Sequence, residues 1–147
     1  MTRGQRGARI VPVTQTRFVA TTIRRDWREV YAYAADPRHL VAWASGLAEA
    51  RVSEDPDRPG TWLADSPMGR VEVVFAPPND LGVLDHTVRL PDGVEVPNPL
   101  RVVPLGDGAE VVFHVRHRDG TSDEEFAADA DHVARDLEAL RRTLESG

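Results

Sequence analysis

The residue best placed to take part in chemistry is His86, because its neighbours at every second position are apolar. These neighbours are Leu84, Val88 and Leu90. In a strand such residues share one face, so the His86 imidazole is expected to point into the interior. There it could orient a carbonyl or hydroxyl group of a ligand, or act as a general base with a shifted pKa. The alternative is a core histidine whose ring is satisfied by a backbone carbonyl or a buried water.

Other candidates for ligand contact are large apolar or amphipathic side chains: Trp43, Trp62, Met68, Phe75 and Phe113. Tryptophan could form the wall of a pocket for a planar apolar ligand, although each of the five could equally be ordinary core.

Arg101 is a candidate of a different kind, since it follows a stretch broken by prolines and its direction cannot be read from alternation. If it points inward, it is a buried cation that needs an anionic partner, such as a ligand carboxylate or phosphate. If it points outward, it is one more solvated arginine on a sheet.

Other groups of polar residues in the sequence do not predict a metal, nucleophilic or nucleotide site. His114 and His117 fall on opposite faces of a strand, so they cannot chelate one metal together. Asp129, His132 and Asp136 share a helix face, but that face lies beside the apolar stripe and should be solvated. The sequence contains no G-x-S-x-G elbow and no glycine-rich phosphate loop leading from a strand into a helix. We therefore expect no metal and no cofactor, and assign no catalytic residue.

The composition excludes further classes. The chain has 147 residues, no cysteine and a net charge of -6, which rules out disulfides and thiol chemistry and argues against nucleic acid as the main partner. It has no apolar run of about 18 residues, so no membrane span is expected. The arginine- and glycine-rich beginning lacks the apolar region of a secretory signal, and a cytoplasmic location is expected.

The elements that must position these residues follow from the patterning. Residues 1–15 read as a flexible tail and 16–147 as one domain. A strand at Arg17–Thr22 is followed by a helix capped by Asp26, with Glu29 as a capping-box partner, and then by a second short helix after Asp36-Pro37. Alternating segments separated by short turns then predict an antiparallel meander with one apolar, buried face.

The last segment predicts a long helix. Ser122 and Glu125 form a capping-box pattern, and apolar residues then recur at steps of three and four: Phe126, Ala130, Val133, Leu137, Leu140 and Leu144. A sheet with one apolar face needs a cover, and this stripe supplies it. The fold class is α+β.

This order resembles the START/Bet v 1-like superfamily, also called the SRPBCC or polyketide cyclase-like group. The residues that carry the resemblance are the segment from Phe18 to Ile23 with Glu29-Val30-Tyr31, the segment from Ala35 to Trp43, and the closing helix from Ser122 to Glu145. The resemblance implies a helix-grip fold, in which a curved antiparallel sheet wraps around a long C-terminal helix. It implies no shared catalytic motif.

Three functions remain open from the sequence. The first is binding of a small, largely hydrophobic molecule, lipid- or polyketide-like, in an internal cavity, by a monomer or homodimer. The second is a polyketide cyclase/dehydratase-like enzyme, which needs at least two polar groups converging in a deep pocket. The third is a protein-interaction module similar to Hsp90-activator domains, which predicts a filled interior and an exposed apolar patch.

Overall fold

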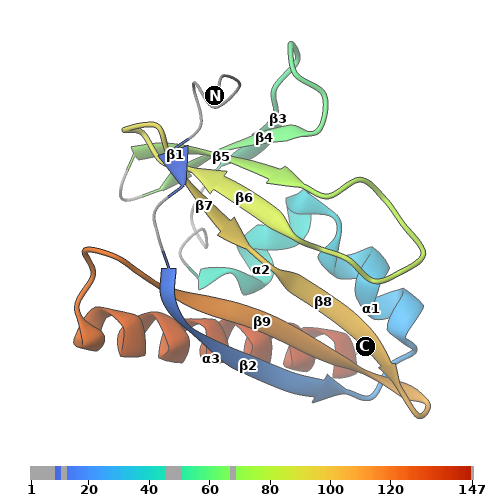
Figure 1. The fold of residues 1–147 in the computed structure, drawn as a ribbon. Helices are drawn as coiled ribbons and strands as arrows, with labels where there is room; N and C mark the ends of the chain where they lie inside the picture. The colour runs from blue at the N-terminus through green and yellow to red at the C-terminus, as the bar shows by residue number, and fades with distance from the viewer. Residues whose placement is uncertain (1–8, 11–12, 46–50, 67–68, 147) are drawn as a thin grey trace, which may run out of the picture.

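The computed structural model describes residues 9–10, 13–45, 51–66 and 69–146, and all structural statements concern these residues (Figure 1). Two sheets form its framework. The six-stranded sheet runs in the order β1 (Arg9–Ile10), β7 (Val94–Asn98), β6 (His86–Arg89), β5 (Gly69–Phe75), β4 (Thr61–Ser66) and β3 (Val52–Glu54). The three-stranded sheet runs in the order β2 (Val13–Ile23), β9 (Gly108–Arg118) and β8 (Leu100–Leu105).

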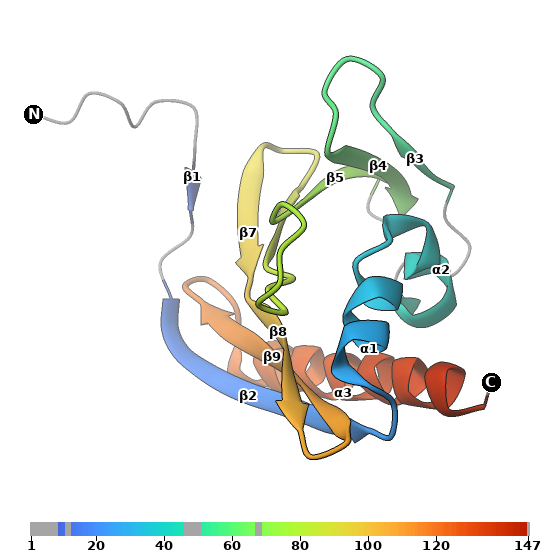
Figure 2. The same cartoon turned by 90° about the vertical axis from the view of Figure 1, so that its right-hand side faces the viewer.

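The two sheets form one curved surface. Only Pro99 separates β7 from β8 along the chain, and Val83 forms an isolated bridge to Arg101 of β8. Neighbouring strands are antiparallel, except that β1 pairs with β7 in parallel. Figure 2 shows the strands curving round one side of the molecule, with the helices on the other side.

Short helices follow β2, as expected. They are α1 (Trp27–Ala34), the 3₁₀ turn η1 (Pro37–His39) and α2 (Leu40–Trp43). The Asp26 carboxylate accepts a hydrogen bond from Arg28 N at 2.8 Å and so caps α1. The predicted capping box does not form there, because the Glu29 carboxylate turns to Arg25 at 3.5 Å instead.

The long helix α3 (Asp123–Glu145) closes the fold and packs against β2, β9 and α2. The capping box predicted at its start is present: Ser122 Oγ accepts from Glu125 N at 3.0 Å, and Glu125 Oε1 accepts from Ser122 N at 2.8 Å. Every residue of the predicted stripe is buried except Val133, which is half-buried. The helix-grip α+β fold is thus the fold of this chain.

Some predicted boundaries differ from the structure. Within the segment expected to be a tail, β1 forms at Arg9–Ile10 and β2 begins at Val13. These short pieces lack a strong alternation, and their strand conformation comes from pairing with β7 and β9. The strand expected over Ala48 to Val52 falls partly outside the described residues, and β3 is described from Val52.

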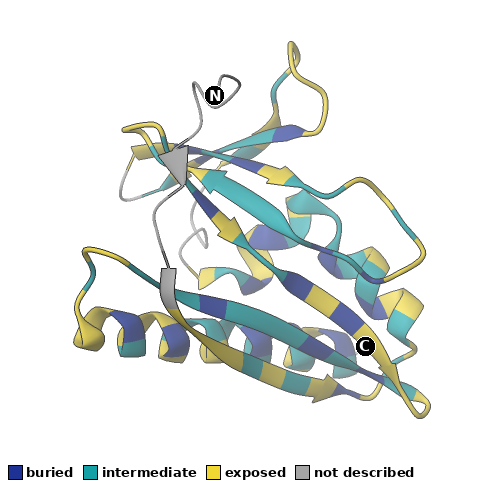
Figure 3. Cartoon of the chain, in the orientation of Figure 1, coloured by how far each residue is buried: buried dark blue, intermediate teal, exposed yellow. Residues whose placement is uncertain are grey.

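The inner faces of the two sheets are packed differently. In the three-stranded sheet the inward-facing Leu100, Val102 and Val111 are each at most 1% exposed. On the six-stranded sheet, several residues that face the same interior are only half-buried: Trp62, Phe75, His86, Val88 and Leu90. Figure 3 shows β6 mostly in the colour of intermediate burial, whereas β8 carries fully buried positions. Inward residues that keep accessible surface indicate that the space beneath this sheet is not completely filled.

Candidate functional site

His86 is the first residue of β6 and faces the interior, as its alternation predicted. Its cross-strand neighbours are Phe75 on β5 and Asn98 on β7. The imidazole centroid lies 5.0 Å from that of Phe75 and 6.0 Å from that of Phe113, which reaches it from β9. Three of the residues proposed from the sequence therefore meet at one place.

The hydrogen bonding of His86 fixes its tautomer. Nδ1 lies 3.0 Å from the carbonyl oxygen of Leu84, and since a carbonyl can only accept, Nδ1 carries the proton. Burial lowers the pKa of His86, and this effect outweighs the Leu84 carbonyl and the neighbouring Asp85 carboxylate, which raise it. The ring is therefore neutral near pH 7, and Nε2 offers a lone pair that can accept a hydrogen bond.

A cavity of about 320 Å³ lies between β6, β7, β9 and α3. Its apolar wall consists of Val88, Leu90, Val96, Phe113, Val115 and Val133. Its size lies at the lower end of the range for small-molecule pockets, roughly 300–1,000 Å³. His86 does not line this cavity itself, but it shares its sheet face with Val88 and contacts Phe113, so it adjoins the inner end.

The polar lining comes from residues that the sequence reasoning did not select as ligand contacts: Asn98, Arg116, Arg118, Asp129 and His132. The arginines were missed because alternation places them on the opposite face from Val115. β9, however, pairs with β8 only from Gly108 to Phe113, so its last residues have a free edge beside the cavity. A strand at a free edge can present both of its sides to one cavity, and a burial pattern in the sequence does not reveal this.

His132 also takes part in a cluster that joins α2 to α3. Its Nε2 lies 3.0 Å from Ser45 Oγ and 3.5 Å from an Asp136 carboxylate oxygen, and Ser45 Oγ donates to Asp136 at 2.7 Å. One imidazole nitrogen faces both partners, whereas a catalytic triad uses the two nitrogens separately. The cluster is therefore a structural link. No three acidic or histidine side chains in the described part of the chain come together as a metal site.

The remaining predicted contacts lie elsewhere. Trp43 is buried among the helices, 6% exposed, and its Nε1 is buried without a hydrogen-bond partner. Trp62 is half-buried on β4 opposite Val73, on the inner face but away from the described lining. Met68 lies outside the described residues.

Arg101 points outward and is corrected as a site residue. Leu100 and Val102 take the inward positions of β8, which leaves Arg101 on the exposed face. Its guanidinium donates to both oxygens of Asp85, at 2.9 and 2.7 Å. This bidentate pair lowers the pKa of Asp85 and supplies the anion that the sequence had left open as a ligand group.

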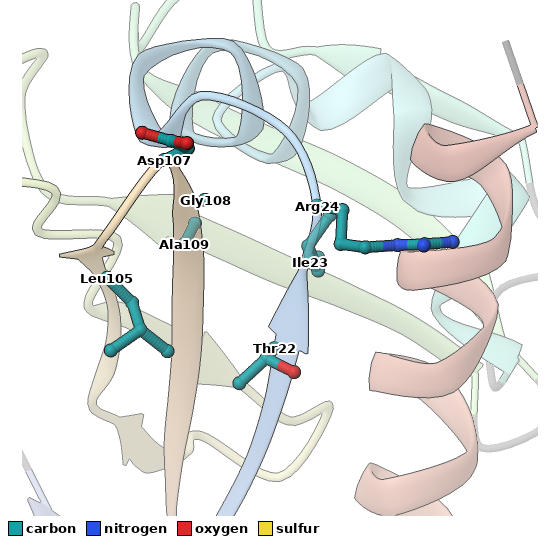
Figure 4. Close-up of a pocket in the computed structure, with 7 residues that line it drawn as sticks. All are labelled: Thr22, Ile23, Arg24, Leu105, Asp107, Gly108 and Ala109. Carbon is teal, nitrogen blue, oxygen red and sulfur yellow. The ribbon is translucent and has the colours of Figure 1, made fainter.

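A second depression, of about 430 Å³, lies between the end of β2 and the β8–β9 hairpin. Figure 4 shows that Arg24 extends towards α3, away from Leu105 and Asp107. Arg24 is already paired with Glu145 of α3, at 3.7 Å. Although this depression is larger, its charged groups diverge, so it is a weaker site than the cavity beside β9.

The curved sheet and the closing helix define a START/Bet v 1-like fold. Solved structures with this arrangement include a START superfamily protein from Mycobacterium smegmatis, 12% identical, with a TM-score of 0.63 over 89% of this chain and 99% of that one. Ara h 8.0201 is 12% identical, with a TM-score of 0.65 over 90% and 99%. DynU16, from the dynemicin biosynthetic locus, is 16% identical, with a TM-score of 0.67 over 91% of this chain but only 48% of that one.

At the level of sequence, no protein-family model matches the chain, and no curated protein matches it either. The solved structures therefore establish the fold, while function has to be argued from the site. None of the helices in the described ranges is long and apolar enough to cross a membrane.

Proposed function

We propose that this protein binds a small, largely apolar molecule in the cavity between β6, β7, β9 and α3. The observation that carries the proposal is the unfilled inner face of the six-stranded sheet. Val88 and Leu90 face inward, stay half-buried and line the cavity. A ligand that covers this apolar surface removes it from water, and this burial lowers the free energy of the complex.

The packing argues against the interaction-module alternative. A module that works through its surface would fill its interior, as the three-stranded sheet does against α3. The core of the described residues is instead divided into separate clusters, and the cluster around Val71 and Val73 on β5 is distinct from the one around Leu137 and Leu140 on α3. Among the described residues only the half-buried Phe75 packs against both clusters, and it does so beside His86. A main core with a smaller satellite cluster is usual in a domain, but this thin connection leaves the inner face around Val88 and Leu90 incompletely covered, which favours ligand binding over an interaction module.

A cyclase-type enzyme is the second candidate, and His86 is the observation that favours it. A neutral imidazole with a free Nε2 is suited to act as a general base. Asn98 is its cross-strand neighbour and donates through Nδ2 to Val96 O at 3.1 Å. The carbonyl oxygen of that amide can accept but not protonate a substrate, so the pair supplies one base and no matching acid. A base without a matching acid favours ligand binding over catalysis as the function of the cavity.

The proposal is tested by titration with N-phenyl-1-naphthylamine, a neutral apolar probe whose fluorescence rises out of water. Wild-type protein is expected to bind it, and Val88→Trp, which fills the cavity, is expected to weaken binding at least about tenfold because the site is occluded. The matched control is Val74→Trp, since Val74 lies on β5 with its side chain 44% exposed. Failure of the wild type to bind, or equal binding by Val88→Trp, would overturn the proposal.

A further inference from the structure

The cavity beside β9 carries two arginines that differ from most others in the molecule. Most of the other described arginines pair with carboxylates, as Arg58 does with Asp55 and Glu72. Arg116 and Arg118 both line the cavity, and neither forms an ion pair with any residue that the structure describes. Both are half-buried. They are two residues apart in one strand, so they lie on the same side of β9.

Arg116 is the more exceptional of the two. Its Nε atom is buried and has no hydrogen-bond partner among the described residues. A guanidinium stays charged at every physiological pH, so its N–H groups remain donors that need an acceptor. Buried donors are nearly always satisfied in native proteins, by protein atoms, water or a ligand. Arg116 is thus a preformed donor site at the edge of a ligand cavity.

The charges around the cavity define the complementary ligand. Arg116 and Arg118 contribute two positive charges and Asp129 one negative charge, while His132 is engaged with Ser45. Arg116, Arg118 and Asp129 together give the lining one net positive charge, although the whole chain has a net charge of -6. One carboxylate would balance this local charge. A guanidinium also matches a carboxylate in geometry, because its planar fork can donate two parallel hydrogen bonds.

Phe113 and Val115 of the apolar wall lie on β9 with the arginines, but the rest of the wall comes from other elements. Val88 and Leu90 stand on and just after β6, and Val96 stands on β7, opposite the last residues of β9. The cavity therefore combines a hydrocarbon-binding wall with a cationic edge. This division fits an amphiphilic molecule better than one that is apolar throughout.

We propose that the ligand is an amphiphilic organic monoanion, in chemical class a medium-chain carboxylate, whose carboxylate group is bound by Arg116 and Arg118. Its hydrocarbon part contacts the apolar wall that includes Val88 and Phe113. This inference rests on the proposed binding function and adds the chemical class of the ligand.

The test displaces N-phenyl-1-naphthylamine with decanoate or with 1-decanol, which have the same chain length but different head groups. Wild-type protein is expected to prefer decanoate by roughly tenfold, as charged hydrogen bonds of this kind confer. The double variant R116Q/R118Q is expected to lose that preference and to keep its affinity for 1-decanol. The charge-matched control R70Q/R135Q changes two exposed arginines and should keep the preference.

Two results would overturn the inference and leave the binding function standing. One is a wild type that binds the probe but does not distinguish decanoate from 1-decanol. The other is a double variant that retains the full preference. If the wild type does not bind the naphthylamine probe at all, the binding function itself fails, and the inference fails with it.

A second measurement needs no variant. The decanoate affinity of wild-type protein should fall as potassium chloride is raised, because salt screens the attraction between the arginines and the carboxylate. The affinity for 1-decanol should not fall. Equal responses of the two ligands to salt would contradict a role for the arginines.

Discussion

The imidazole Nδ1 of His86 lies 3.0 Å from the backbone carbonyl oxygen of Leu84, two positions earlier in the chain. This contact holds the ring in one tautomer and directs Nε2 away from the strand's own backbone. Because burial also lowers the pKa of His86, the ring stays neutral under conditions in which an exposed histidine begins to charge.

The lowered pKa of His86 makes stability depend on pH in a defined direction. Below the ordinary histidine pKa of about 6.5 the unfolded chain takes up a proton at this site that the folded protein resists, so stability falls as the pH falls. Stability is expected to fall by up to about 1.4 kcal/mol per pH unit until the folded pKa is reached. His86→Asn removes this titration and keeps a donor for Leu84 O. Urea denaturation of both proteins between neutral and acid pH isolates the difference, and parallel curves would contradict the assignment.

Leu137 tests the packing of α3 against the sheet. It lies in the middle of the buried stripe and is 1% exposed. Leu137→Asp would bury an unpaired carboxylate, and a loss of more than about 4 kcal/mol is expected, enough to unfold a domain of ordinary stability. Ala134→Asp changes an exposed position of the same helix and serves as the control. A melting temperature within a few degrees of wild type for Leu137→Asp would contradict this packing.

Arg116→Gln tests whether the unpaired guanidinium destabilises the ligand-free protein. The change removes a charge with a buried, unsatisfied donor, so stability should stay constant or rise by about 1 kcal/mol. Arg25→Gln is the contrast, because Arg25 Nη1 donates to Leu144 O at 2.6 Å and its loss should lower the melting temperature. A clear destabilisation by Arg116→Gln would mean that this side chain serves the fold.

The capping box of α3 makes a smaller and separate contribution. Ser122→Ala removes the acceptor for Glu125 N and should cost about 1 kcal/mol. Ser53→Ala changes an exposed serine of β3 and should have little effect. Chemical denaturation at neutral pH measures both, and equal stabilities of the two variants would argue against the box.

Periodicity was sufficient for most of the fold. The steps of three and four from Phe126 to Leu144 predicted both the length of α3 and its buried face, because a helix repeats every 3.6 residues. The inward direction of His86 followed from a period of two in the same way. Asp26 caps its helix as expected. Glu29 pairs with Arg25 instead of accepting a hydrogen bond from the backbone. Which partner an exposed carboxylate takes depends on local geometry that a sequence motif does not contain.

The site was predicted only in part. Phe75, His86 and Phe113 do meet, because alternation fixes which side of a strand a residue faces. Arg116 and Arg118 were not found, since the cavity meets β9 where β8 no longer covers its edge. Arg101 could not be placed because Pro97 and Pro99 interrupt the pattern before it, and its partner Asp85 lies 16 residues earlier in the chain.

The most direct test of the central claim is to locate the bound ligand by NMR on valine and leucine methyl groups, with N-phenyl-1-naphthylamine added to the labelled protein. Ligand in the cavity predicts shifts for Val88, Val96 and Val133, and unchanged signals for Val103 and Leu105, which are exposed on the outer face of β8. Shifts confined to Val103 and Leu105, or no shifts at all, would contradict binding inside the fold.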